Sequence, residues 1–443
     1  MLIQFSVKNY KSFKDEVKLS MVASKYDDTR WADNVIDVPK FNLKLLRSAV
    51  IYGANASGKT KLFEAMDFMS SFALTSFKEG QVNQMIKVEP FRLSTETENA
   101  PSLFEVNFII DNELYRYGFE VNEKEIVSEW LYKRANTKEV ELFYRDYQNF
   151  EIHRTYKQAK FVVDNDTVSE NVLLLSLVAR FNDKIAKKIL VWLSKFRILK
   201  GHEESRYMGF SIGMLQDEVS KAKVLQFMKG ADFNIEDLKP VTINIEELPK
   251  DMPEELRTFL MDKIRDGESS FFSDVSVFHK KYDENRNPVN GNQRFSMDKE
   301  ESAGTRKYFS FSGHLIKAIE VGNIAVIDEL DAKLHPNLVL KIAETFNSIE
   351  TNPNNAQLIF NSHDDNLLSS GIFRRDQIWF TEKDRYGVST LFSLDSFRNE
   401  NGEKPRKEED YARNYIRGKY GAIPYLRDFD KLFLTQKEVV HEE

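Results

Sequence analysis

Gly53-Ala54-Asn55-Ala56-Ser57-Gly58-Lys59-Thr60 matches the phosphate-binding pattern GxxxxGK[ST] at every constrained position. In such a loop, glycines let backbone N–H groups surround the β- and γ-phosphates, Lys59 supplies a mobile positive charge, and the Thr60 hydroxyl can bind Mg²⁺. The stretch therefore predicts a site for a nucleoside triphosphate with its Mg²⁺. The residues expected to bind the nucleotide are Gly53, Asn55, Ala56, Ser57, Gly58, Lys59 and Thr60.

The sequence on both sides of this loop fits the same interpretation. Residues 48–52 form a short apolar run that is typical of a buried strand. After Lys59, apolar side chains recur at helical spacing, at Leu62, Ala65, Met66, Met69, Phe72 and Ala73. A strand, a glycine loop and a helix N-terminus place partial positive charge where the phosphates would lie.

Length and composition limit the remaining possibilities. A chain of 443 residues with 41% hydrophobic content can form about two or three domains. No apolar run approaches the roughly 18 residues that span a bilayer, and the N-terminus has no signal-peptide pattern, so we expect a cytoplasmic protein without membrane contact. The absence of cysteine excludes disulfides and thiolate metal sites, and the net charge of −7 argues against general affinity for nucleic acid.

Hydrophobic patterning divides the chain into three parts. Alternation in residues 2–7, and in residues 104–110 and 114–121 around Asp111-Asn112, predicts strands, with a hairpin at the second site. One apolar stripe in residues 171–199 predicts a long amphipathic helix, formed by Leu174, Leu177, Val178, Phe181, Ile185, Ile189 and Leu193. The polar stretch that follows, residues 201–300, is interpreted as a helical insertion without a coiled-coil arm.

Beyond Ser302 the pattern becomes regular again. A buried strand at residues 324–327, a helix beginning at Pro336 and a strand at residues 357–360 predict a βαβ unit in a parallel sheet. Because side chains that do chemistry gather at the carboxyl ends of parallel strands, Asp328 is expected to bind Mg²⁺ and Glu329 to polarise the attacking water. His363 follows the next strand and is expected to reach the γ-phosphate from the same edge.

A second helix N-terminus precedes this strand. Ser302 is a suitable N-cap for an apolar helix, so that Ser302 and Gly304 form a second candidate phosphate site. One chain cannot easily place two helix N-termini on one γ-phosphate, whereas two chains arranged head to tail can.

The order of these motifs resembles ABC-type ATPase heads of the SMC, RecF and OLD kind, and most closely the stand-alone prokaryotic AAA-family ATP-binding proteins of the RloA and AbiL type. The motifs that carry the resemblance are Asn9-Tyr10-Lys11-Ser12-Phe13, the P-loop, Ser302-Ala303-Gly304-Thr305, Asp328-Glu329-Leu330-Asp331, Ser362-His363 and the segment 416–425. The resemblance implies that Lys59 and Thr60 are Walker A residues, Asp328 the Walker B carboxylate and Glu329 the general base. It also implies that His363 is the switch histidine, and that Ser302 and Gly304 act on a partner chain's nucleotide.

The sequence departs from transporter ABC heads in two places. The signature reads Ser-Ala-Gly-Thr instead of Ser-Gly-Gly-Gln, and His335 stands about where a D-loop aspartate is expected. No Q-loop glutamine is assigned, and the candidates are Gln81, Gln84 and the Pro90-Phe91 region.

The resemblance covers both ends of the chain and implies an α/β ABC-type head with a mixed central sheet and an antiparallel β subdomain. It does not define the middle of the chain, where the polar pattern predicts the helical insertion. Residues 1–165 and 296–443 would form the two halves of the head and residues 166–295 the insertion. Such a protein would bind and hydrolyse ATP with Mg²⁺ in a head-to-tail dimer. It would be the sensor or motor of an antiphage, abortive-infection complex with a separately encoded nuclease or toxin effector and a DNA or phage-protein trigger. The alternatives are a DNA-maintenance ATPase that clamps DNA, and a scaffold that ATP stabilises with little turnover.

Overall fold

The computed structural model describes residues 1–25, 29–79, 85–201, 203–242, 272–399, 401–406 and 409–424. The Q-loop candidates Gln81 and Gln84, and the last residue of the segment 416–425, lie outside these ranges. No helix in the described ranges has both the length and the apolar character needed to cross a membrane.

A six-stranded mixed sheet forms the centre of the molecule. In spatial order its strands are β11 (Arg197–Lys200), β15 (Ile324–Asp328), β16 (Gln357–Asn361), β5 (Ser48–Gly53), β17 (Ile378–Lys383) and β18 (Ser389–Ser393). All neighbouring pairs are parallel except β17 and β18. The strands β5, β15 and β16 are buried along their whole length, which explains their nearly continuous apolar sequences. The predicted βαβ unit is confirmed.

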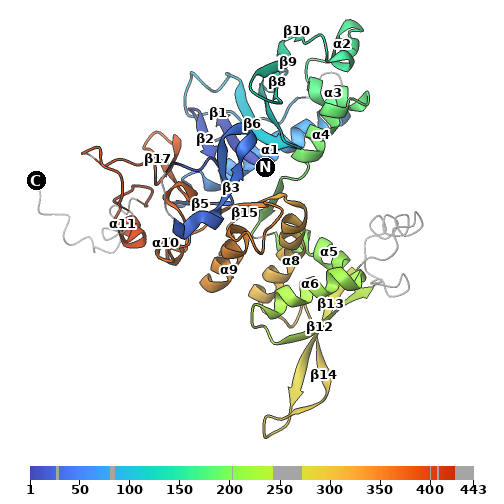
Figure 1. Cartoon of the computed structure of the whole chain (residues 1–443), viewed down its shortest axis with the longest axis vertical. Coiled ribbons are helices and arrows are strands. Elements are labelled where there is room, and N and C mark those ends of the chain that lie inside the picture. Colours follow the sequence, from blue (N-terminus) through green and yellow to red (C-terminus); the bar gives the residue numbers. More distant parts are fainter. Residues whose placement is uncertain are drawn as a thin grey trace, which may run out of the picture.

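Alternate residues of the central strands enter different hydrophobic cores. Ala49 and Ile51 belong to the core that contains helix α1 (Lys59–Glu79), whereas Val50 and Tyr52 belong to the core that contains α8 (Ala303–Val321) and α9 (Pro336–Asn347). This alternation is the consequence of the two-residue period of a strand. Figure 1 shows α8 and α9 together beside the central strands.

A second, antiparallel sheet packs in the same core as α1. Its spatial order is β10 (Asn149–Ile152), β9 (Glu139–Asp146), β8 (Ile126–Arg134), β7 (Glu113–Val121), β6 (Ser102–Ile110), β1 (Leu2–Lys8) and β2 (Val17–Ser20). The predicted strand at the N-terminus and the predicted hairpin are both confirmed, as β1 and as β6–β7. Asp111 and Asn112 connect the hairpin with φ values of +47° and +60°, the left-handed pair that a tight two-residue hairpin turn requires.

The long helix predicted for residues 171–199 is wrong. The structure has two helices there, α3 (Leu174–Arg180) and α4 (Lys184–Leu193), followed by the strand β11. Asn182 adopts the left-handed conformation with φ +66°, and Asp183 then caps α4 by accepting a hydrogen bond from the Ala186 amide. A left-handed residue ends a right-handed helix. The chain therefore breaks into two helices at Asn182, although the apolar stripe continues from α3 into α4.

The segment interpreted as a helical insertion contains helices and also strands. Its helices α5 (Glu204–Gly213) and α6 (Glu218–Lys229) pack against α8, and a small antiparallel sheet follows, formed by β12 (Ile235–Thr242), β13 (Phe272–Tyr282) and β14 (Pro288–Ser296). The β13–β14 hairpin projects away from the body of the molecule (Figure 1). Strand β11 lies within residues 166–295, which are predicted to form the insertion, but it is part of the central sheet, so this range also contributes to the head.

Short elements complete the described fold. They are η1 (Thr29–Asn34), β3 (Val35–Val38), η2 (Pro39–Phe41), β4 (Leu43–Leu46), α2 (Lys157–Asp164), η3 (Met214–Gln216), α10 (Asn366–Ser369), η5 (Arg375–Gln377) and α11 (Tyr411–Ile416). The predicted class, α/β with a mixed central sheet, an antiparallel β subdomain and an insertion with helices, is confirmed. The domain limits at 165/166 and 295/296 stay predictions.

Candidate nucleotide site

The P-loop connects the end of β5 to the first turn of α1, as its sequence predicts. Ala56 and Gly58 have φ values of +63° and +121°, so the loop turns through left-handed conformations between strand and helix. A side chain at Gly58 would also collide with Ser389, whose Oγ lies 2.8 Å from the position that a Cβ would take. Glycine at position 58 is therefore required by backbone conformation and by space.

Lys59 points back into its own loop. Its Nζ donates hydrogen bonds to the carbonyl oxygens of Gly53 (2.6 Å) and Ala54 (3.1 Å). Burial lowers the pKa of the Lys59 ammonium to about 8, although the nearby carboxylates of Asp328 and Glu329 oppose this shift. An anion in the loop would offer this buried cation a stronger partner than two neutral carbonyls.

Thr60 and Asp328 meet although 268 positions separate them. The Thr60 hydroxyl donates to Asp328 Oδ1 at 3.2 Å, and the Asn361 side-chain amide donates to the same oxygen at 2.5 Å. Asp328 is the last residue of β15 and is almost fully buried. A hydroxyl and a carboxylate oxygen, side by side, are the type of ligand that Mg²⁺ prefers, so the donor set fits this metal.

Glu329 follows immediately and turns away from the strand. Its backbone is left-handed, with φ +53°, and its amide donates to Asn361 Oδ1. The single side chain of Asn361 therefore holds both carboxylate residues, one through its NH₂ group and the other through its oxygen. A positive φ is uncommon for a glutamate and costs conformational free energy. The contacts around Glu329 must therefore hold its backbone in this conformation.

His363 lies at the same edge of the sheet, beyond the end of β16. Its backbone amide donates to Asp331 Oδ2 at 2.7 Å, and the Asp364 amide donates to the same oxygen at 3.1 Å. Burial lowers the pKa of the His363 imidazole below its usual value, and the charge of Lys59 acts in the same direction. This shift favours the neutral imidazole, which can donate or accept a hydrogen bond.

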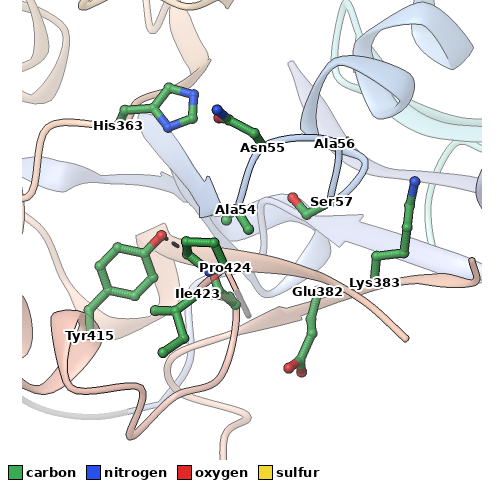
Figure 2. A pocket seen from close by; sticks show the side chains of 12 residues that line it. Ala54, Asn55, Ala56, Ser57, His363, Glu382, Lys383, Tyr415, Ile423 and Pro424 are labelled. Atoms are coloured by element: carbon green, nitrogen blue, oxygen red, sulfur yellow. Dashed lines mark hydrogen bonds between the residues drawn. The ribbon is translucent and has the colours of Figure 1, made fainter. Parts of the chain in front are cut away.

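His363 and the P-loop line the same cavity, which has a volume of about 490 Å³. Its lining comes from the loop, from the end of β17 and from the C-terminal part of the described chain: Gly53, Ala54, Asn55, Ala56, Ser57, His363, Glu382, Lys383, Tyr415, Ala422, Ile423 and Pro424. Figure 2 shows the side chains of Asn55 and His363 at the same rim. The Tyr415 hydroxyl donates to the Ala422 carbonyl at 3.3 Å, and the Tyr415 ring lies 5.6 Å from that of Tyr52 in β5, so α11 packs beside the strand that leads into the P-loop.

Ser302 and Gly304 lie elsewhere. Ser302 is exposed and caps α8, because its Oγ accepts from the Thr305 amide at 3.0 Å. In the described part of the chain, no hydrogen bond or ion pair joins Ser302 to the P-loop. The structure thus brings together all the other predicted site residues but leaves this helix N-terminus at the surface.

Asn361 is a site residue that the sequence did not identify as one, because nothing local distinguishes an asparagine at a strand end. We expect Asn361→Leu to reduce ATP turnover by about 10- to 100-fold, since Asp328 loses a hydrogen bond and the Glu329 amide loses its acceptor. Titrating Mg²⁺ against initial rate measures the effect, and exposed Asn337 in α9 offers the control Asn337→Ala. Equal rates for both variants would show that Asn361 has no role at the site.

Comparison with known proteins places this geometry in a family. The family model described as "AAA domain, putative AbiEii toxin, Type IV TA system" matches residues 48–369. That span begins with β5, ends with α10 and contains the P-loop, Ser302, Asp328, Glu329 and His363. Membership in an AAA-domain family implies the use of a nucleotide, usually with Mg²⁺.

No curated protein matches this chain. Among solved structures, the SMC head domain from Thermotoga maritima is similar at 13% sequence identity and a TM-score of 0.40, covering 88% of this chain and 98% of that chain. The family of this chain therefore follows from the family match alone. Since that match covers most of the chain, the chain belongs to the AAA-domain family so described.

Proposed function

We propose that this chain is a Mg²⁺-dependent ATP hydrolase. The observation that carries the proposal is the hydrogen bond between the Thr60 hydroxyl and Asp328 Oδ1, which joins the P-loop helix to the end of β15. The site combines two oxygen atoms that can bind a metal with a buried lysine in a phosphate-binding loop. Among common small molecules, a nucleoside triphosphate with its Mg²⁺ fits this combination best.

The residues divide the chemistry among them. Lys59 and the loop amides would bind the β- and γ-phosphates, and Thr60 and Asp328 would hold Mg²⁺, which when bound neutralises charge on the phosphate oxygens. Glu329 would accept a proton from water as the water oxygen forms its bond to the γ-phosphorus. The bond to the β-phosphate oxygen then breaks, and ADP and phosphate result. His363 would donate a hydrogen bond near the γ-phosphate.

Two chains would complete the site. Ser302 and Gly304 lie at an exposed helix N-terminus outside the site, and such a terminus is suited to bind the γ-phosphate held by another chain. A head-to-tail dimer would place each chain's α8 on its partner's nucleotide, so that ATP favours assembly and hydrolysis releases it.

The biological setting that we propose is antiphage defence, with this chain as the sensor or motor and a separately encoded nuclease or toxin as the effector. The family description, which names a toxin of a type IV toxin–antitoxin system, supports this setting. Protection of cells from phage by this gene together with its neighbouring gene, and loss of protection with Glu329→Gln, is the expected result. If ATP turnover responded instead to DNA in a salt-dependent manner and no protection occurred, the DNA-maintenance function would be favoured.

Removal of the metal tests the hydrolase proposal directly. We expect purified protein to release phosphate from ATP with Mg²⁺ present, to stop when EDTA is in excess, and to recover when Mg²⁺ is restored. The reason is that the oxygen atoms of Thr60 and Asp328 can act on the phosphates only through the cation that they bind. Turnover that EDTA leaves unchanged, or no turnover at all at saturating ATP and Mg²⁺, would contradict the proposal.

A further inference from the structure

A buried lysine joins helix α8 to the loop that carries Glu329. The side chain of Lys307 has no exposed surface, and its Nζ donates to the carbonyl oxygens of Glu329 and Ala332, both at 2.7 Å. An ammonium has three hydrogens to donate, and two of them are used on this one loop. Lys307 therefore holds the loop through its backbone carbonyl groups.

The loop that begins at Glu329 has an unusual backbone conformation, which hydrogen bonds to its peptide groups stabilise. Glu329 has the left-handed φ of +53°, and its amide is already fixed by Asn361. Lys307 binds the carbonyl of the same residue, and the Ala332 amide donates to that carbonyl as well, at 3.2 Å. The peptide groups on both sides of the Glu329 α-carbon are thus fixed, which restricts where its carboxylate can point.

The surroundings of Lys307 are built to accept an ammonium. A Cβ at Gly201 would lie 3.0 Å from Lys307 Nζ and 2.5 Å from the Glu329 carbonyl oxygen, so only glycine leaves room there. The ring of Phe311, one turn further along α8, lies 5.4 Å from the ammonium. Burying a charge is unfavourable relative to an apolar side chain of the same size, so a purely space-filling role would be met better by methionine.

The start of α8 touches the same loop at a second point. Gly304, in the first turn, packs so closely on the Lys333 carbonyl that a Cβ would lie 2.8 Å from that oxygen. Lys333 is also left-handed, with φ +63°. Ser302 caps this turn only five residues before Lys307. The first two turns of α8 therefore contact the Glu329 loop in two ways, through packed backbone at Gly304 and through the hydrogen bonds of Lys307.

We propose that Lys307 is a positioning residue that fixes the Glu329 loop and couples the Ser302 end of α8 to ATP hydrolysis within the same chain. This inference rests on the proposed hydrolase function. It adds a link between the surface that would contact a partner's nucleotide and the chain's own general base. A chain whose α8 has been moved by a partner would then hydrolyse its own ATP at a different rate.

The variant Lys307→Met tests this link, because methionine fills similar space without a donor. We expect kcat to fall by about 100-fold, while the affinity for ATP stays within about twofold, since a small displacement of a catalytic group has effects of this size. In the Glu329→Gln background the same substitution should cause no further loss, because it acts through Glu329. The control is Lys317→Met, an exposed lysine on the same helix, which should leave kcat unchanged.

Hydrogen exchange of the backbone amides supplies a readout that does not need turnover. With Lys307→Met, amides of residues 328–335 should exchange faster than in the unaltered chain, while those of α1 keep their rates. If Lys307→Met does not bind ATP, Lys307→Gln replaces it, because glutamine is smaller and keeps a neutral donor. Unchanged exchange in the loop, or an additional loss of rate in the Glu329→Gln background, would overturn the inference. Absence of turnover in the unaltered chain would instead contradict the hydrolase proposal and leave the exchange test standing.

Discussion

Lys59→Ala is expected to weaken ATP binding by about 100-fold or more. The Lys59 ammonium is buried in the P-loop and now donates to the carbonyls of Gly53 and Ala54, from which it can turn to the phosphates. Hydrogen bonds to charged groups contribute about 1.5–3 kcal/mol each, and 1.4 kcal/mol corresponds to a tenfold change in affinity. Titration with a fluorescent ATP analogue measures the change.

The neighbouring lysine provides the matched control. Lys61 lies on the same turn of α1, is partly exposed and forms an ion pair with Glu64 at 3.0 Å. Lys61→Ala should keep the affinity of the unaltered chain. If both substitutions weakened binding to the same degree, the effect would be one of general charge and Lys59 would have no specific contact with the nucleotide.

Glu329→Gln is expected to lower ATP turnover by about 1,000-fold while leaving ATP affinity nearly unchanged. Glutamine keeps the size of the side chain and the backbone contacts with Asn361 and Lys307, but it cannot accept the proton of the attacking water; general base catalysis contributes about 10²- to 10⁴-fold. Single-turnover rates separate this loss from product release. Glu344→Gln, at a partly exposed position of α9, is the control, and a rate loss there equal to that at Glu329 would exclude the general-base role.

Local sequence patterns were sufficient to predict the centre of the fold. Strand β5, the P-loop and the start of α1 form one continuous stretch, so their contacts are encoded by neighbours in the chain. The same is true of β15, whose apolar run ends at Asp328 and Glu329. Because parallel strands present their carboxyl ends at one edge, the meeting of Thr60 with Asp328 also followed from the sequence.

Contacts across long sequence separations were not predictable in this way. Asn361 and Lys307 hold Glu329 from 32 and 22 positions away, and a single asparagine or lysine has no local signature of such a role. The contact of the Tyr415 ring with Tyr52 likewise depends on how α11 folds back onto β5. The break at Asn182 could not be predicted, because the apolar periodicity continues through it. A single left-handed residue changes the direction of the chain there.

In the proposed head-to-tail dimer, ATP bound at one chain's P-loop is enclosed by Ser302 of a second chain. The mass in solution, measured by light scattering with and without ATP and Mg²⁺, tests it most directly on three variants: Glu329→Gln, Lys59→Ala, and Glu329→Gln combined with Ser302→Arg. We expect ATP to double the mass of the Glu329→Gln chain only, because Lys59→Ala cannot bind the nucleotide and Ser302→Arg blocks the partner surface. An equal response to ATP in Glu329→Gln and Lys59→Ala, or none in any variant, would contradict it.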